Sequence, residues 1–242
     1  MDGRRRLLER LPTELRQGLR HRVRRLRRPA RLGVLRRTTP LSDEWGRDRG
    51  TPVDRYYIER FLEREQASIQ GRVLEVLDAG YTGRFGTRVQ QSDVLDIDPT
   101  NPDATIVADL AAADAIQSAS FDCVILTQTL QYVYDLPAAV AHVRRILKPG
   151  GVVLCTLPSA SRIAKRYFDT EYWRFTTASA RALFEASFDR DAVRVESHGN
   201  VLTSIAFLAG LAAEELSERE LKEADPFFPL VICVVARRYS NE

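Results

Sequence analysis

The chain has only three cysteines, and their spacing suits neither a metal centre nor a disulfide scaffold. Cys123, Cys155 and Cys233 lie far apart, each within an apolar run, and none forms a CxxC or Cys/His cluster. We expect buried, reduced thiols, which are typical of a reducing compartment. The sequence therefore predicts no bound metal and favours a cytoplasmic location.

Long apolar runs are also absent. No segment approaches the roughly 18 apolar residues that a membrane-spanning helix needs. No apolar core follows the N-terminal arginines, as a signal peptide would require. Of the 242 residues, 44% are hydrophobic and 29% are charged, which is the composition of a globular protein rather than a disordered one.

Charge is distributed unevenly along the chain. Residues 1–40 carry 14 arginines against three acidic residues, a net charge of +11. Because the whole chain carries +3, residues 41–242 carry −8. This difference separates a basic leader, residues 1–40, from the rest of the chain. There, loop residues followed by helical spacing distinguish a lid segment with a helix, residues 41–70, from the main domain, residues 71–242.

The leader has helical periodicity. Its apolar residues recur every three or four positions between arginines, at Leu15, Leu19, Val23 and Leu26. A helix over 12–28, ended by Pro29, would be amphipathic with a cationic face. It would bind an anionic membrane peripherally, or remain a solvated extension with no dedicated partner. Nucleic acid is disfavoured because residues 1–40 contain no aromatic side chain on which a base could stack.

Residues 121–158 form the most informative stretch, FDCVILTQTLQYVYDLPAAVAHVRRILKPGGVVLCTLP. An apolar run leads through a polar corner into a helical segment with one apolar stripe, and a second apolar run follows. Between them Pro149 cannot continue the helix, and the two glycines after it permit a reversal of the backbone. The pattern predicts a strand, a loop, a helix and a strand.

This order resembles the class I methyltransferases that use S-adenosyl-L-methionine, in which an FDxV strand, an LEHV-like loop, an amphipathic helix and a KPGG turn follow one another. The resemblance covers about residues 53–238 and is strongest at KPGG. It implies an enzyme with an α/β, Rossmann-like sheet of seven strands and helices on both faces, preceded by an N-terminal helical extension. The last pair of strands is expected to be antiparallel.

The first strand and its loop read GRVLEVLDAGYTG, residues 71–83. In the family this strand ends in an acidic residue and a GxGxG-like loop, whose glycines and following helix N-terminus accommodate the methionine end of the cofactor. By resemblance Glu75 helps to hold the cofactor's amino group; the alternative is that it caps the following helix. Leu77 and Ala79 replace the first two glycines, before Gly80, and Leu77 either narrows the cofactor cleft or points into the core.

Two further corners are expected to bind the adenosine. An acidic residue about 20 positions beyond the loop can accept hydrogen bonds from ribose hydroxyls, and Asp96 and Asp98 are both candidates, with Asp98 preferred because the strand over 93–97 should open there. By resemblance Asp109 and Leu110, at the end of a short strand over 104–110, face the adenine. The short link from Asp98 leaves the usual intervening helix absent or reduced.

Four residues are candidates for positions near the reacting groups. Thr127 and Gln128 end the fourth strand, near the transferable methyl group by resemblance. Tyr132 stands where many relatives have a histidine; it positions an acceptor hydroxyl or simply packs. His198, at the end of a strand over 192–197, is a candidate general base because a neutral imidazole can take a proton near pH 7; the alternative is a hydrogen-bonded residue at a strand end.

Two aromatic segments are candidates for the acceptor site. One is the lid, with Tyr56 and Tyr57; the other is YFDTEYWRFTT, with Tyr172, Trp173 and Arg174. Aromatic faces beside carboxylates and an arginine suit a sugar-like acceptor, although the tryptophan could instead plug the core. The pairing of DRGTPVDRYYIERF with YWRFT is similar to uncharacterised bacterial methyltransferases associated with glycan or natural-product assembly.

The sequence thus favours O-methylation of a hydroxyl on a sugar or another small molecule. A non-catalytic scaffold with a degenerate cofactor site is an alternative, supported by Leu77. A nucleotide-dependent oxidoreductase is disfavoured because no GxGxxG follows a predicted strand. The apolar helical segment 201–224 either packs on the sheet or forms a dimer face, so the oligomeric state stays open.

Overall fold

The computed structural model describes residues 15, 17, 19, 22, 23, 26, 33 and 36–239. The chain divides into two compact units, Met1–Thr39 and Pro40–Glu242. In the first unit, the described leader residues of the predicted apolar stripe are helical and exposed: Leu15, Leu19, Val23 and Leu26. The rest of the helix expected over 12–28, with Pro29, lies outside the described residues.

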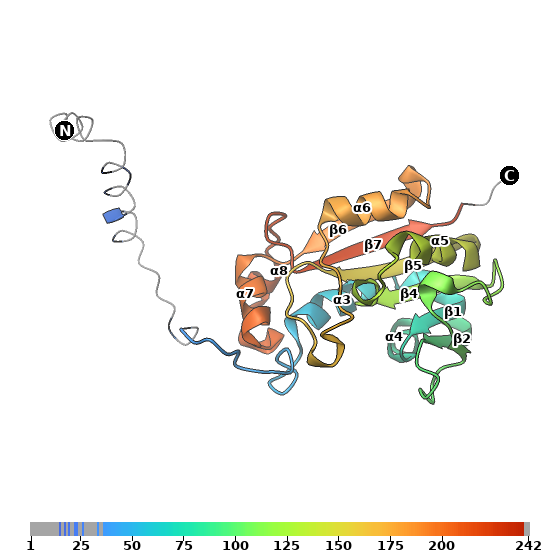
Figure 1. Ribbon diagram of the computed structural model, residues 1–242, viewed down its shortest axis with the longest axis horizontal. Coiled ribbons are helices and arrows are strands. Elements are labelled where there is room, and N and C mark those ends of the chain that lie inside the picture. The colour runs from blue at the N-terminus through green and yellow to red at the C-terminus, as the bar shows by residue number, and fades with distance from the viewer. Residues whose placement is uncertain are drawn as a thin grey trace. The chain divides into compact units, whose positions relative to one another are not determined.

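The second unit is built on one seven-stranded sheet with the strand order β3-β2-β1-β4-β5-β7-β6 (Figure 1). Neighbouring strands are parallel except that β7 runs antiparallel to both β5 and β6. The predicted fold class and the antiparallel end of the sheet are confirmed. The strands are β1 Gln70–Val76, β2 Arg88–Asp96, β3 Ile106–Val107, β4 Phe121–Thr127, β5 Leu147–Pro158, β6 Val193–His198 and β7 Val231–Arg237.

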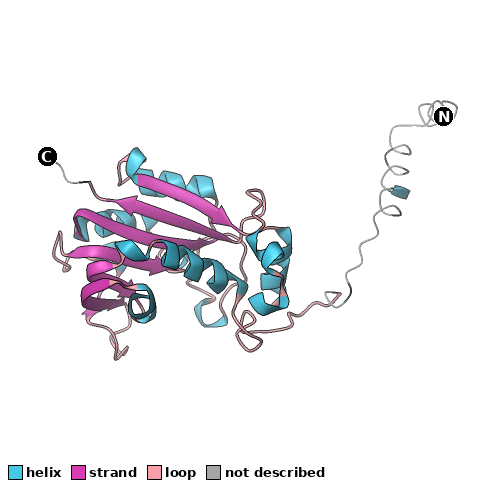
Figure 2. Cartoon of the chain, turned by 180° about the vertical axis from the view of Figure 1, so that it is seen from behind, coloured by secondary structure: helices cyan, strands magenta, loops and turns pink. Residues whose placement is uncertain are grey.

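Helices cover both faces of the sheet (Figure 2). One face packs on α5 (Leu136–Ile146) and α6 (Thr177–Glu185). The other packs on α3 (Val53–Arg64), α4 (Gly80–Phe85), α7 (Val201–Ala209) and α8 (Glu218–Lys222). Alternate residues of β4 enter the two cores, which is why the central strands are apolar throughout.

Side-chain caps mark the starts of α5, α6 and α7. Asp135 accepts a hydrogen bond from the Ala138 backbone N–H at the start of α5, and Asn200 caps α7 in the same way. Thr176 forms a reciprocal capping box with Ser179 at the start of α6.

The KPGG segment differs from the predicted turn. Strand β5 begins at Leu147, directly after α5, and residues 148–151 form a bulge within it, because pairing with β4 resumes only at Val152. Gly150 has a φ of +82°, and a Cβ on Gly151 would lie 2.9 Å from the Lys148 carbonyl oxygen. Both glycines are therefore required by the bulge.

The segment 201–224 is divided rather than continuous. Gly210 ends α7 with a φ of +78°, and a Cβ there would lie 2.5 Å from the Ser42 carbonyl oxygen. A short 3₁₀ turn, Ala213–Glu215, precedes α8. The expected loss of the helix between β2 and β3 is confirmed, since residues 98–105 form turns.

All three cysteines are buried in strands and unpaired, as predicted. Burial raises the pKa of each thiol, so the thiols stay protonated. Within the described part of the chain, no helix is long and apolar enough to cross a membrane.

Candidate functional site

The candidate site lies where β1, β2 and β4 end. Strand β1 runs between β2 and β4 and parallel to both, so their carboxyl ends share one edge of the sheet. In open α/β sheets this edge is where ligands bind. The predicted residues Glu75, Asp96 and Thr127 all stand at it.

Leu77 holds the backbone shape of the glycine that it replaces. Its φ is +78°, in the left-handed region that favours glycine, and its side chain is 55% exposed. Its N–H donates to the Leu95 carbonyl, and its own carbonyl accepts from Asn101 Nδ2 at 2.8 Å. The side chain therefore does not enter the core.

Glu75 caps α4, as the alternative interpretation predicted. Its carboxylate accepts hydrogen bonds from the backbone N–H of Tyr81 at 3.1 Å, and from the N–H and hydroxyl of Thr82, both at 2.7 Å. Only 2% of the residue is exposed. Burial raises the pKa of Glu75, although the Thr82 and Tyr81 hydrogen bonds favour the ionised form. Loop residues Ala79 and Gly80 lead directly into this capped turn.

The end of β2 carries both predicted ribose ligands. Asp96 accepts from the Asp98 N–H at 3.0 Å and from Asn101 Nδ2 at 2.6 Å, so the same amide joins Asp96 to Leu77. Asp98 is half-buried like Asp96, and hydrogen bonds from Thr100 lower its pKa. Two oxygen-rich groups therefore stand at this corner.

The predicted adenine corner follows the two-residue strand β3. Asp109 is exposed and caps a short 3₁₀ helix by accepting from the Ala111 N–H at 2.9 Å. Leu110 is buried beside it. Asp109 thus presents its carboxylate at the rim, while Leu110 belongs to the core.

The end of β4 leaves two amide atoms without partners. Gln128 has a φ of +50°, and its Nε2 is buried with no hydrogen-bond partner among the described residues. Gln131, which the sequence reasoning missed, is 3% exposed, and its Oε1 likewise finds no partner among those residues. Buried polar atoms are nearly always paired, so these two atoms make the end of β4 a candidate ligand-binding corner. The only indication in the sequence is a second glutamine three positions after the first.

An aromatic wall stands beside this corner. The backbone N–H groups of Tyr172 and Trp173 donate to the Gln131 carbonyl, and Trp173 Nε1 donates to the Val133 carbonyl at 3.0 Å. Tyr134 packs against both rings, with centroids 5.2 and 6.1 Å away. Trp173 remains 37% exposed, so it does not plug the core. Arg174 pairs with Glu171 at 2.8 Å.

Tyr132 lies in the short 3₁₀ helix Leu130–Tyr132, directly after Gln131. Its ring contacts Tyr167, with centroids 4.8 Å apart. Burial, and then the Glu171 carboxylate, raise the pKa of Tyr132, so its phenol stays protonated at neutral pH.

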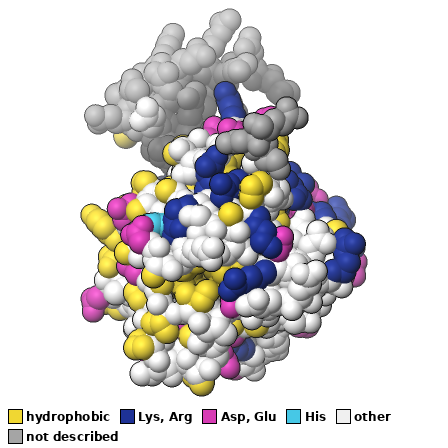
Figure 3. Space-filling model, turned by 90° about the vertical axis from the view of Figure 1, so that its right-hand side faces the viewer, with side chains coloured by type: hydrophobic (Ala, Val, Ile, Leu, Met, Phe, Trp, Pro, Cys, Tyr) yellow, Lys and Arg dark blue, Asp and Glu magenta, His cyan; other side chains and the backbone are white. Residues whose placement is uncertain are grey.

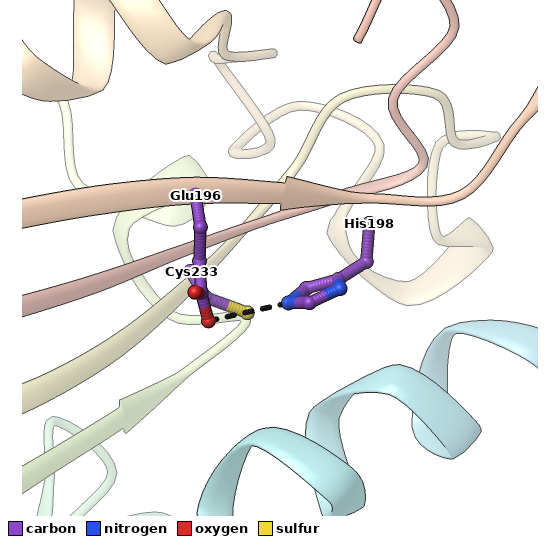
Figure 4. A group of neighbouring side chains, drawn as sticks. All are labelled: Glu196, His198 and Cys233. Carbon is purple, nitrogen blue, oxygen red and sulfur yellow. Dashed lines mark hydrogen bonds and ion pairs between the residues drawn. The ribbon is translucent and has the colours of Figure 1, made fainter. Parts of the chain in front are cut away.

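His198 lies at the end of the outer strand β6. Figure 4 shows it pointing toward Glu196 and Cys233, with Nε2 3.3 Å from Glu196 Oε1. Burial, and then the Arg64 charge, lower the pKa of His198, so the ring is neutral at pH 7. Three strands separate β6 from β1, which places His198 about 19 Å along the sheet at the usual strand spacing.

The lid residues lie on α3. Tyr57 is buried, stacks on His198 and donates its hydroxyl to the Leu221 carbonyl at 2.8 Å. Tyr56 lines a hollow of about 430 Å³ bordered by α3, α4 and residues 213–221. Arg55, which the sequence reasoning also missed, donates from Nη1 to the Tyr81 hydroxyl at 2.8 Å.

The opposite edge of the sheet has a hollow of its own. Figure 3 faces the end of the molecule where β7 finishes, and Lys and Arg side chains gather there in several patches. A hollow of about 430 Å³ lies at this edge, lined by Asp122, the KPGG bulge and Arg237. Asp122 pairs with Lys148 at 2.6 Å, and Arg237 donates to Ser68. These charged groups already have partners within the protein.

Comparison with known proteins agrees with this geometry. Residues 45–193 match a family described as a methyltransferase domain. No curated protein sequence matches the chain. Similar solved structures include a S-adenosylmethionine-dependent methyltransferase from Archaeoglobus fulgidus, with 14% identity, 76% of this chain and 94% of that chain covered, and a TM-score of 0.51.

Another similar structure is a S-adenosylmethionine-dependent methyltransferase from Thermotoga maritima, described as a possible histamine N-methyltransferase. It shares 17% identity, with 76% of this chain and 93% of that chain covered and a TM-score of 0.50. At this identity the likeness shows the fold, and the family match does not support the oxidoreductase alternative. The chain therefore belongs to the methyltransferase domain family, as a class I enzyme that uses S-adenosyl-L-methionine.

Proposed function

We propose that the chain transfers a methyl group to a hydroxyl of a sugar or another small polar molecule. The observation that carries this proposal is the corner after β4, where the buried amide atoms of Gln128 and Gln131 lack partners beside the exposed rings of Tyr134, Tyr172 and Trp173. One amide atom donates and the other accepts, as a hydroxyl requires. Exposed aromatic faces suit the apolar face of a sugar ring.

The residues at the carboxyl edge fit the cofactor. Leu77 and Ile97 expose apolar side chains at the ends of β1 and β2, and the Gln128 Nε2 lacks a partner among the described residues. We propose that residues 77–80 line the methionine end, held in shape by Glu75. The other proposed contacts are Asp96 and Asp98 to the ribose, Asp109 and Leu110 to the adenine, and Thr127 and Gln128 near the methyl group.

When bound, the cofactor supplies an activated methyl group, so the chain's own task is to align the acceptor oxygen and exclude water. Trp173, Tyr172 and Arg174 are proposed to hold the acceptor on the outer side of the corner. Tyr56 and Tyr57 belong to the lid helix, where Tyr57 keeps α3 docked on α8. Their proposed role is to support the lid.

The acceptor hydroxyl must also lose its proton. Tyr132 is proposed to position this hydroxyl, because a protonated phenol next to Gln131 can donate a hydrogen bond to it. His198 is in the neutral form that a base requires. Its bond to Glu196 and its place on the outer strand favour a structural role over that of the base.

Methyl-labelled cofactor tests the proposal. The full chain is incubated with [methyl-¹³C]-S-adenosylmethionine and fractionated small metabolites, and the carbon chemical shift of the product distinguishes O-methyl from N-methyl groups. We expect an O-methyl product in the carbohydrate fraction, and a large loss of it with Trp173→Ala. An N-methyl product, or label only in other fractions, would contradict the proposal.

Residues 1–40 carry a second proposal, peripheral binding to anionic membranes from the cytoplasmic side. Its support is the net charge of +11 and the exposed apolar residues of the leader. Sedimentation with phosphatidylserine vesicles should retain the full chain and lose a form without residues 1–40, while neutral vesicles should retain neither. Equal retention of both forms would favour the solvated extension.

A further inference from the structure

The first turn of α4 cannot receive the cofactor's carboxylate through its backbone. The N–H of Gly80 donates to Asp78 at 2.8 Å, and the N–H groups of Tyr81 and Thr82 donate to Glu75. The carboxylates of Asp78 and Glu75 therefore already accept from the backbone N–H groups that were expected to bind the cofactor's carboxylate. A negative charge brought to this loop needs another partner.

Arg55 of α3 supplies a cation next to the loop. Its Nη1 donates to the hydroxyl of Tyr81, the residue after Gly80, and its Cζ lies 6.0 Å from the centre of that ring. Over the residues that the structure describes, Nε and Nη2 donate to no protein group. The guanidinium is half-buried and held in place on one side, with donors left on the other.

Asp54 adds the opposite charge at the same place. Among the described residues, its carboxylate accepts only from the Arg55 backbone N–H. Burial raises the pKa of the Tyr81 phenol, and the nearby carboxylates of Glu59 and Asp54 raise it further. Glu59 is already paired with Arg84 at 2.7 Å. Asp54 lies near two arginine charges, those of Arg55 and Arg47; burial raises the pKa of Asp54, and these two charges oppose that rise.

We propose that Arg55 binds the α-carboxylate of the cofactor's methionine end and that Asp54 faces its ammonium group. An α-amino acid end carries one charge of each sign, and a guanidinium fork is well matched to a carboxylate. In this chain a side-chain pair on the lid helix thus replaces the backbone site of the glycine loop. The inference concerns the cofactor and does not depend on the identity of the acceptor.

Two nucleosides distinguish binding at this subsite from binding in the rest of the pocket. S-adenosylhomocysteine carries the amino acid end, whereas 5′-methylthioadenosine has the same adenosine and sulfur without it. Isothermal titration of the full chain should show that Arg55→Met weakens the affinity for S-adenosylhomocysteine by about tenfold or more, the loss expected for one charge-assisted hydrogen bond. The affinity for methylthioadenosine should change by less than twofold. Asp54→Asn should act in the same selective way, and Arg55→Lys should recover part of the affinity.

Arg84→Met is the matched control, since Arg84 is an exposed arginine on α4 that pairs with Glu59. It should leave both affinities unchanged. Unaltered methylthioadenosine binding shows that the Arg55→Met pocket is folded. Equal weakening of both nucleosides, or no weakening of either, overturns the inference. An acceptor other than a sugar would leave these titrations as predicted, so the two proposals fail separately.

Discussion

The two halves of the carboxyl edge differ in how their polar groups are paired. At the ends of β1, β2 and β3 each carboxylate accepts from a nearby backbone N–H: Glu75, Asp78, Asp96, Asp98 and Asp109. At the end of β4 the buried amide atoms of Gln128 and Gln131 have no partner among the described residues. The first half is therefore shaped by its own hydrogen bonds, whereas the second keeps two buried amide atoms that the proposed acceptor would pair.

This contrast separates stability from activity. Removing one of the carboxylates at the ends of β1, β2 and β3, the proposed cofactor half, should weaken the fold because it leaves backbone N–H groups unpaired. Removing one of the two unpartnered amides at the end of β4, the proposed acceptor half, should reduce methyl transfer and leave the fold as stable as before.

The largest effect is expected from Glu75→Ala. The substitution removes three hydrogen bonds of a buried carboxylate and leaves the Tyr81 and Thr82 N–H groups unpaired. We expect a loss of about 3 kcal/mol in the free energy of unfolding, measured by urea denaturation. Glu223→Ala, at an exposed position, is the control and should change little. A loss for Glu75→Ala no larger than that of the control would show that the hydrogen bonds of Glu75 do not stabilise the fold.

Gln131→Met is the corresponding substitution at the end of β4. Methionine keeps the length of the side chain and removes the unpaired Oε1. Methyl transfer to the identified acceptor should fall by about tenfold, while the free energy of unfolding stays equal or rises by about 1 kcal/mol. Gln117→Met, at an exposed position, should alter neither quantity. A stability loss in Gln131→Met with unchanged transfer would assign Gln131 to the fold instead of the acceptor corner.

Leu77→Gly tests the cost of the loop's shape. Glycine adopts a φ of +78° without strain, so we expect the free energy of unfolding to rise by about 1 kcal/mol. Ile97→Gly, at another exposed apolar residue without a positive φ, should lower it instead. Equal changes in the two variants would show that Leu77 bears no backbone strain.

The smallest effect concerns His198, outside both halves. Because burial and Arg64 lower its pKa below 6.5, the folded state resists protonation. Above pH 6.5 the residue contributes no pH dependence; as the pH falls below 6.5 the unfolded chain takes up the proton first and stability is lost, until the folded pKa is passed. His198→Gln should flatten this part of the pH profile. An unchanged profile would contradict the shift.

The sequence predicted the fold where its patterns are local. The strand, helix and strand over 121–158 were correct because periodicity and the Pro149 stop act within a few residues. The division of segment 201–224 was missed because the need for Gly210 comes from Ser42, far away in sequence.

The site was predictable in position but less so in detail. Strand ends located Glu75, Asp96 and Thr127 because the carboxyl ends of parallel strands meet. The exposure of the Leu77 side chain depends on the positive φ of its backbone. The position of Arg55 depends on a contact with Tyr81, 26 residues away. Neither can be read from composition or spacing.

Hydrogen exchange with and without S-adenosylhomocysteine tests most directly whether the cofactor binds at the ends of β1, β2 and β4. Binding there should slow amide exchange in residues 77–82, 96–101 and 127–132. Exchange should not change at the opposite edge, in residues 67–70 and 149–152. Protection at that opposite edge alone, or no protection anywhere, would show that the cofactor does not bind at the ends of these strands.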